Sequence, residues 1–303
     1  MMRGLDSKAV LLGILALTGI AFSWFWGRAL RMRSRALRDS GDRVARSWPS
    51  VYQALVGALT DFLDTLGIGS FATTTSLCKL KGDVEDPLIP GTLNIGHTLP
   101  TLAQAFIYIA IVRVEMTTLV LMIGAAVAGA WLGAGAIAVW PKRKIQIGLG
   151  IALLGAAALL LGQQFDLFPR GGDTLGLHGG LLVVGLVGNF ALGGLMTLGM
   201  GLYGPCMILV SLLGMNPTTA FPIMMGSCAF LMPVASVRFL SRSAYSPRAA
   251  LGLTVGGVPA VLVAAWIVRS LPLHAVRVWV VAIVVYTAFT MLRSAARDPP
   301  ARG

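Results

Sequence analysis

Three titratable side chains interrupt long apolar stretches of this sequence. Asp61 and Asp64 stand shortly before Gly67, and His97 lies in the stretch Pro87–Val112, which contains no Asp, Glu, Lys or Arg. Ionisable residues inside membrane segments are costly and are functional by default, and histidine changes its charge in the physiological pH range. We therefore predict that Asp61, Asp64 and His97 couple protons to the movement of a solute or set the charge of a binding site.

Each of these residues also has a structural alternative. Asp61 and Asp64 can lie near a membrane interface, where they would cap a helical hairpin or pair with Lys79 or Lys81. For His97, a satisfied structural hydrogen bond explains a buried ring as well as a coupling role does.

A second set of candidate residues surrounds glycines that stand inside apolar segments. Glycine interrupts a continuous helix, and a half-helix that begins after the break directs free N–H groups and a partial positive charge at an anion. No Lys or Arg lies beside the breaks, which favours release over tight binding. The alternative is that the hydroxyls cap helices or bond back to carbonyls and that Cys206 only packs. The predicted substrate-binding residues are Thr65, Gly67, Gly69, Ser70, Thr74, Asn94, Thr197, Gly199, Gly201, Tyr203 and Cys206.

These glycines belong to an internal repeat. The segment Thr65–Gly69 (TLGIG) recurs without a gap 132 residues later as Thr197–Gly201 (TLGMG). Paired glycine-interrupted hydrophobic segments in two halves of a chain are the best sequence indication of a transporter binding site. The alternative is that the glycines only let helices pack closely. Asp61, Asp64 and His97 occur in the first copy alone, so we expect any proton coupling to reside in the first copy.

The composition places most of the chain in lipid. Only 12% of the residues are charged and 56% are hydrophobic, whereas soluble domains carry about 25% charged residues. The net charge of +12 comes from short loops between apolar spans, so we expect no nucleic-acid partner. The three cysteines form no CxxC pair, so we expect no metal site, no disulfide framework and no cofactor. We predict that the protein is not an enzyme.

The distribution of basic residues predicts the topology. Ala9–Gly27 is expected to be a retained transmembrane helix rather than a signal peptide, because no small-residue cleavage site follows it. If each glycine-broken segment is a re-entrant hairpin, 18 of the 24 Lys and Arg residues lie in the cytoplasm, as the positive-inside rule requires. The N-terminus is then outside and the C-terminus cytoplasmic. Three full crossings per repeat invert the second copy.

The predicted fold is therefore an all-α polytopic membrane protein with two inverted-topology repeats. Each repeat has a re-entrant broken hairpin and three transmembrane helices, and one extra transmembrane helix precedes them. The expected divisions are an N-terminal helix and basic cytoplasmic loop (1–48), repeat 1 (49–164), an external loop (165–176), repeat 2 (177–293) and a cytoplasmic tail (294–303).

Two segments resemble a known family. Gly57–Ala72 (GALTDFLDTLGIGSFA) is similar to the first signature of the TauE/SafE sulfite exporter family of membrane permeases, and Gly188–Tyr203 (GNFALGGLMTLGMGLY) is similar to its second. The resemblance extends over about 49–293. The chain departs from the commoner form of the signature, in which a Gly-Gly-Gly run follows the turn, because Ser70-Phe71 and Leu202-Tyr203 stand there.

The resemblance implies a permease for small sulfur-containing anions, such as sulfite or organosulfonates, in the bacterial cytoplasmic (inner) membrane. The lipid bilayer and protons are the other expected partners, and a homodimer is compatible with the sequence. Other readings remain open: a transporter of another anion or of a neutral solute, a membrane thiol–disulfide electron carrier, or an assembly factor. The electron carrier needs one cysteine in each repeat, whereas Cys206 aligns with Thr74 and Cys78 with Val210.

Overall fold

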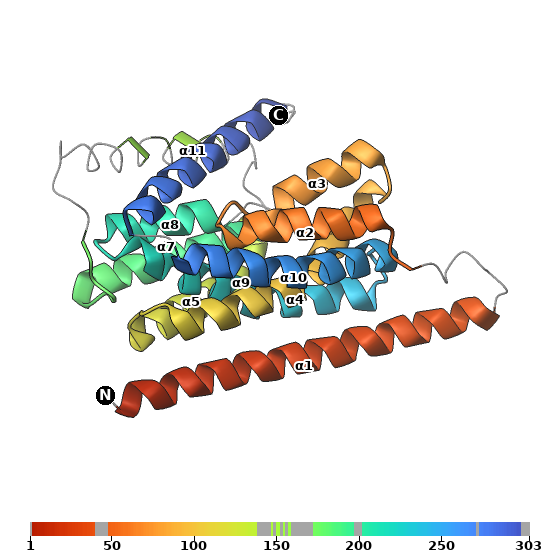
Figure 1. Ribbon diagram of the computed structural model, residues 1–303, viewed down its shortest axis with the longest axis horizontal. Helices are drawn as coiled ribbons and strands as arrows, with labels where there is room; N and C mark the ends of the chain where they lie inside the picture. Colours follow the sequence, from red (N-terminus) through yellow and green to blue (C-terminus); the bar gives the residue numbers. More distant parts are fainter. Residues whose placement is uncertain are drawn as a thin grey trace. The chain divides into compact units, whose positions relative to one another are not determined.

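The computed structural model describes an all-helical protein (Figure 1). The described residues are 2–39, 48–137, 172–196, 202–270 and 273–297, together with positions 147, 150, 151, 154, 157 and 158. Within them there is no β-strand, only an isolated bridge between Thr174 and Met215. The all-α prediction is therefore confirmed.

Four of the described helical segments are long and apolar enough to cross a membrane, and the protein is accordingly membrane-embedded. They are Ser7–Met32, Gly179–Met196, Pro217–Ser241 and Pro247–Ile267. The first contains the predicted N-terminal transmembrane helix. Helix α4 (Ile89–Ile111) is not among the four although it carries no Asp, Glu, Lys or Arg. Its threonines, His97 and Gln104 lower its hydropathy, and they matter for the site below.

The first helix, α1 (Met2–Asp39), packs along α4. Phe22 and Trp26 form a hydrophobic cluster with Ile95 of α4. At the other end of the contact, Lys8 Nζ donates a hydrogen bond to the Ala110 carbonyl at 2.7 Å. Since the low numbers of α1 meet the high numbers of α4, the two helices run antiparallel.

The predicted interruption of the helix at Gly67–Gly69 is confirmed. Helix α2 (Val51–Thr65) begins with a capping box at Ser50, and α3 (Ser70–Lys81) starts after the break. Gly67 has φ 96° and Gly69 has φ 84°, a left-handed backbone that residues with a side chain rarely adopt. In the second copy, α7 (Gly179–Met196) and α8 (Tyr203–Leu212) flank the TLGMG sequence, and residues 197–201 themselves lie outside the described part.

The helix boundaries follow the repeat. Helices α3 and α8 begin 133 residues apart. The helices that follow them in the two copies begin at nearly the same offset. Helix α4 corresponds to α9 (Ala220–Ser241) and α5 (Met116–Ile137) corresponds to α10 (Pro247–Ser270). Short 3₁₀ turns precede α4 and α9, at Asp86–Leu88 and Pro217–Thr219. The last helix is α11 (Leu273–Arg297).

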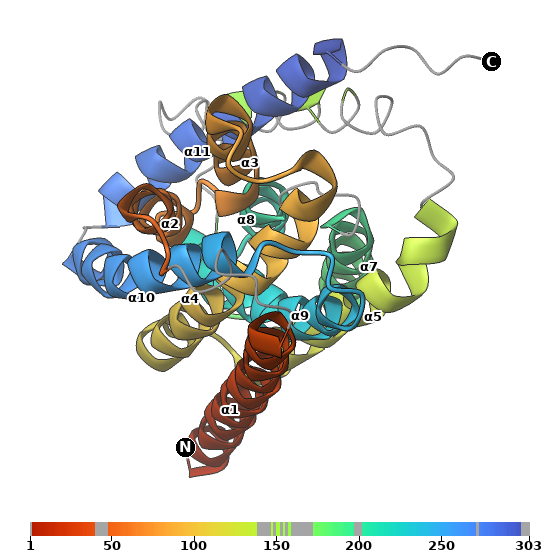
Figure 2. The same ribbon diagram turned by 90° about the vertical axis from the view of Figure 1, so that its right-hand side faces the viewer.

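The chain divides into two compact units that do not coincide with the repeats. The first unit comprises residues 1–66, 70–110 and 228–266, so it holds α1, α2, α3, α4, the C-terminal part of α9 and most of α10. The second comprises 67–69, 111–227 and 267–303, with α5, α7, α8, the N-terminal part of α9 and α11. Figure 2 labels these helices. Each unit thus contains helices from both copies of the repeat.

Glycines bring backbones into contact within each unit. A Cβ on Gly256 of α10 would lie 1.8 Å from the Ala54 carbonyl oxygen of α2, and a Cβ on Gly129 of α5 would lie 1.9 Å from the Phe190 carbonyl oxygen of α7. The close-packing interpretation therefore holds for these glycines, whereas Gly67 and Gly69 form the helix break.

Candidate functional site

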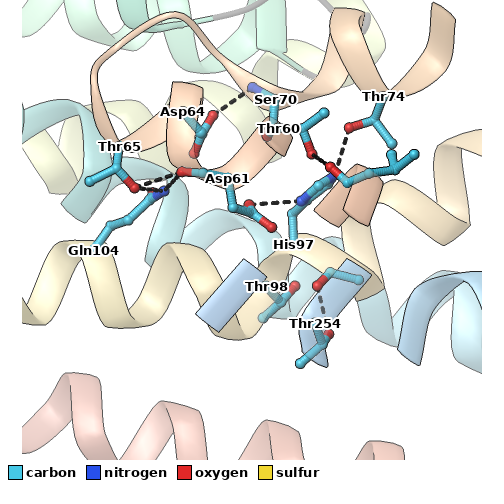
Figure 3. A network of polar contacts seen from close by, with 12 residues as sticks. Thr60, Asp61, Asp64, Thr65, Ser70, Thr74, His97, Thr98, Gln104 and Thr254 are labelled. Atoms are coloured by element: carbon cyan, nitrogen blue, oxygen red, sulfur yellow. Dashed lines mark hydrogen bonds and ion pairs between the residues drawn. The ribbon is translucent and has the colours of Figure 1, made fainter. Parts of the chain in front are cut away.

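A buried polar cluster joins α2, α3 and α4 in the first unit (Figure 3). His97 lies between Asp61 and Thr74. Its Nδ1 is 2.8 Å from Asp61 Oδ1, and its Nε2 is 3.0 Å from Thr74 Oγ1. All three side chains are 0% exposed. The structure therefore brings together residues that lie 36 and 23 positions apart in the sequence.

The second carboxylate oxygen of Asp61 is buried without a hydrogen-bond partner among the described residues. This oxygen, Asp61 Oδ2, lies close to Gly257 of α10. A Cβ added to Gly257 would lie 1.9 Å from Asp61 Oδ2 and 2.8 Å from Pro100 Cγ. A buried polar atom without a partner costs roughly 1–3 kcal/mol, more when it is charged. Such an atom in a native protein calls for an explanation, and protonation of Asp61 would lower the cost of burying it by removing its negative charge.

Asp64 caps the helix that follows the break. Its Oδ1 accepts a hydrogen bond from the Ser70 backbone N–H at 2.6 Å. This contact agrees with the capping part of the alternative for Asp64, while its position relative to a membrane interface and its role in proton coupling remain predictions. The Asp64 carboxyl group thus already accepts the Ser70 N–H at the start of α3. If Asp64 is ionised, an anion that binds at this end of the helix is repelled by its negative charge.

Two polar residues of α4 in this cluster were not predicted from the sequence. Gln104 Nε2 donates a hydrogen bond to Thr65 Oγ1 at 3.0 Å, and Tyr108 donates one to the Thr65 carbonyl at 3.0 Å. Both lie on α4, seven and eleven residues after His97. This spacing is the helical periodicity of one face, so a search for polar stripes as well as charges would have found them.

Pro100 interrupts the hydrogen bonds of α4 next to the cluster. Proline has no N–H, so the carbonyl of Gly96, four residues earlier, has no helical donor. Thr254 of α10 donates its hydroxyl to that carbonyl at 2.6 Å. The Thr254 side chain thereby replaces the missing backbone hydrogen bond and links α10 to α4 next to Pro100.

This explanation predicts a non-additive pair of substitutions. Thr254→Val should destabilise the protein by about 1–2 kcal/mol, because it leaves a buried carbonyl without a donor. In a Pro100→Ala background the amide of residue 100 can donate instead, so the same substitution should cost less by about 1 kcal/mol. Thermal or denaturant unfolding of the four proteins in detergent measures this double-mutant cycle. Equal costs in both backgrounds would contradict the assigned role of Thr254.

The other predicted residues do not join the cluster. The side chain of Asn94 donates to the Pro90 carbonyl of its own helix at 3.3 Å. Tyr203 and Cys206 are buried on α8 of the second unit, and Gly67 faces Met207 and Ile283 of that unit. Gly69 lies in the helix break, and a Cβ there would meet nothing within 4 Å. The last three predicted positions lie outside the described residues: Thr197, Gly199 and Gly201.

The composition of the cluster is hydroxyls, amides, two carboxylates and one imidazole. The described residues contain no group of three or more His, Cys, Asp or Glu that could hold a metal ion. All three cysteines are buried and none forms a disulfide. The chemistry that the cluster offers is the binding and release of protons and hydrogen bonds to a small solute.

Comparisons of the chain with protein-family models, with curated proteins and with solved structures found no match.

Proposed function

We propose that this protein is a secondary membrane transporter that moves a small solute together with protons. The observation that carries the proposal is the fully buried Asp61–His97 pair, with one Asp61 oxygen unpaired, beside an interrupted helix. Such groups in membrane proteins mark proton relays and substrate pathways. Interrupted helices are likewise typical of transporter binding sites.

The proposed substrate is a small sulfur-containing anion such as sulfite or an organosulfonate, and the proposed direction is export. The similarity of Gly57–Ala72 and Gly188–Tyr203 to the TauE/SafE signatures supports this choice. The two carboxylates add a physical condition. An anion close to Asp61 and Asp64 is repelled while both are ionised, so proton uptake should accompany anion binding.

The proposed architecture has two inverted repeats with re-entrant hairpins in a bacterial inner membrane, with the N-terminus outside. It is supported by the 132-residue offset and by the excess of Lys and Arg in the loops assigned to the cytoplasm.

A neutral solute is the second candidate. The observation that favours it is the occupation of the Ser70 amide by Asp64, since this removes one donor that a bound anion would use. A neutral substrate would need no compensating proton.

Transport assays with the purified full-length protein in liposomes separate these candidates. We expect the protein to accumulate sulfite, thiosulfate, sulfoacetate or methanesulfonate when a proton gradient is imposed, and to move protons measured by a lumenal pH dye. Taurine, which is net neutral, tests the second candidate. Liposomes without protein are the control. Uptake of none of these solutes would contradict the proposed substrate class, and solute uptake without proton movement would contradict coupling.

The electron-carrier alternative is tested in the same assay. We expect a variant in which Cys78, Cys206 and Cys228 are all replaced by alanine to retain transport, because the structure contains no disulfide between them.

A further inference from the structure

We propose that Thr74 is a proton-controlled hydrogen-bond donor, which donates to His97 while the ring is neutral and to the transported anion once the ring is protonated. The inference rests on the proposed function and adds to it a mechanism by which proton uptake changes anion binding.

The charge of Asp61 decides which nitrogen of a neutral His97 ring carries the proton. Asp61 Oδ1 accepts at 2.8 Å from Nδ1, and an ionised carboxylate has no hydrogen to donate. In a neutral ring with Nδ1–H, the other nitrogen, Nε2, is an acceptor. Thr74 Oγ1, 3.0 Å from Nε2, must then donate its only hydroxyl hydrogen to the ring.

Protonation of the ring reverses this hydrogen bond. When Nε2 takes up a proton, the new N–H bond becomes a donor and Thr74 Oγ1 becomes its acceptor. The hydroxyl hydrogen of Thr74 must then point elsewhere. The same proton adds one positive charge to a cluster that holds two carboxylates, so repulsion of an anion falls at the moment when the hydroxyl becomes free to donate.

The surroundings of Thr74 favour a ligand as the new acceptor. Thr73, the preceding residue of α3, has a buried hydroxyl with no hydrogen-bond partner among the described residues. Successive residues of a helix point about 100° apart, so the Thr73 hydroxyl is a second, separately directed donor next to Thr74. In repeat 2 the position of Thr74 is occupied by Cys206, a much weaker donor. The switch is therefore confined to the first copy.

Among the described residues near His97, only two others are carboxyl groups that could change their charge with pH. Asp61 and Asp64 of α2 are the charged residues that interact with it, and Phe71 of α3 lies with its ring centroid 6.0 Å away. The α4 residues on the same face, Gln104 and Tyr108, bond to Thr65 of α2. From α10, Thr254 bonds to the Gly96 carbonyl, and Gly257 faces Asp61.

The test compares Thr74→Val with Thr60→Val in the full-length protein. Thr60 is 0% exposed, so it matches Thr74 in burial and in the substitution, but its hydroxyl donates to the Val56 carbonyl of its own helix and not to the His97 ring. Methanesulfonate is the probe because it keeps its charge throughout the range studied. Its KM is measured in liposomes at about pH 6 and about pH 9, and the higher value is set well above the usual histidine pKa because two carboxylates lie near the ring.

We expect Thr74→Val to raise KM about tenfold at the lower pH, because a hydrogen bond to a charged group is lost, and to change it less than about twofold at the higher pH. Thr60→Val and Thr74→Ser should keep the wild-type ratio between the two pH values. An unchanged ratio in Thr74→Val would overturn the switch while leaving proton-coupled transport intact. Failure of the wild type to transport any tested anion would instead contradict the proposed function.

A measurement without transport tests the same inference. The chain has three histidines, and replacing His178 and His274 leaves His97 as the single ¹⁵N-labelled ring. Nitrogen chemical shifts should show Nδ1–H and a bare Nε2 in the neutral form. A neutral ring protonated at Nε2 would overturn the proposal even if Thr74→Val failed to fold.

Discussion

Replacing Asp61 by asparagine should uncouple transport from protons. The amide keeps the size of the side chain, and its oxygen can still accept from His97 Nδ1, which lies 2.8 Å from Asp61 Oδ1. It removes the negative charge that stabilises a protonated ring and the oxygen that can bind a proton itself. Proton movement per transported anion should fall well below the wild-type ratio, because the variant has neither a carboxylate at this position that takes up a proton nor the negative charge that favours a protonated His97.

The measurement is lumenal acidification recorded together with labelled sulfite or methanesulfonate uptake. Asp83→Asn is the matched control, because Asp83 is another carboxylate of the first unit and its Oδ2 accepts from Gln53 Nε2 at 3.2 Å, away from His97. It should keep the wild-type proton-to-anion ratio. If Asp61→Asn also kept that ratio, the buried Asp61–His97 pair would be a structural feature and not the coupling site.

Gly256→Ala should cause the largest loss of stability among single-methyl changes. The added Cβ would lie 1.8 Å from the carbonyl oxygen of Ala54, so backbone meets backbone and no side-chain rotation can relieve the contact. Helices α2 and α10 must move apart, which opens the packing around Asp61. Overpacking of this kind costs roughly 1–3 kcal/mol or more, which corresponds to a fall in Tm of several degrees.

Gly124→Ala provides the matched control for this prediction. Gly124 occupies the same position in the first copy of the repeat, 132 residues earlier, and a Cβ there would meet nothing within 4 Å. Alanine in that helix should be neutral or stabilising by up to about 1 kcal/mol, because glycine is the poorer helix former. Thermal unfolding in one detergent measures both variants. Equal Tm values for the two would contradict the close approach of α2 and α10.

The residues that sequence reasoning found are those whose type alone is unusual for their surroundings. Asp61, Asp64 and His97 were identified because charge is rare in apolar segments, and the structure places all three in one cluster. Asn94 was predicted to bind substrate because it is a polar residue in an apolar segment, and its side chain instead bonds to the Pro90 carbonyl of its own helix. Gln104, Tyr108 and Thr254 were missed because they are uncharged and their importance depends on partners in other helices.

The sequence by itself determined the properties that depend on local chemistry. Apolar composition requires membrane helices, glycine conformations break the helix between Thr65 and Ser70, and the 132-residue offset places matching helices in two copies. The tertiary structure alone decided that Asp64 caps α3, that Thr74 meets His97, and that Thr254 compensates for Pro100. These contacts depend on the register between helices. That register is the sum of many packing contacts and of close backbone approaches such as Gly256 on Ala54, none of which can be read from neighbouring residues in the chain.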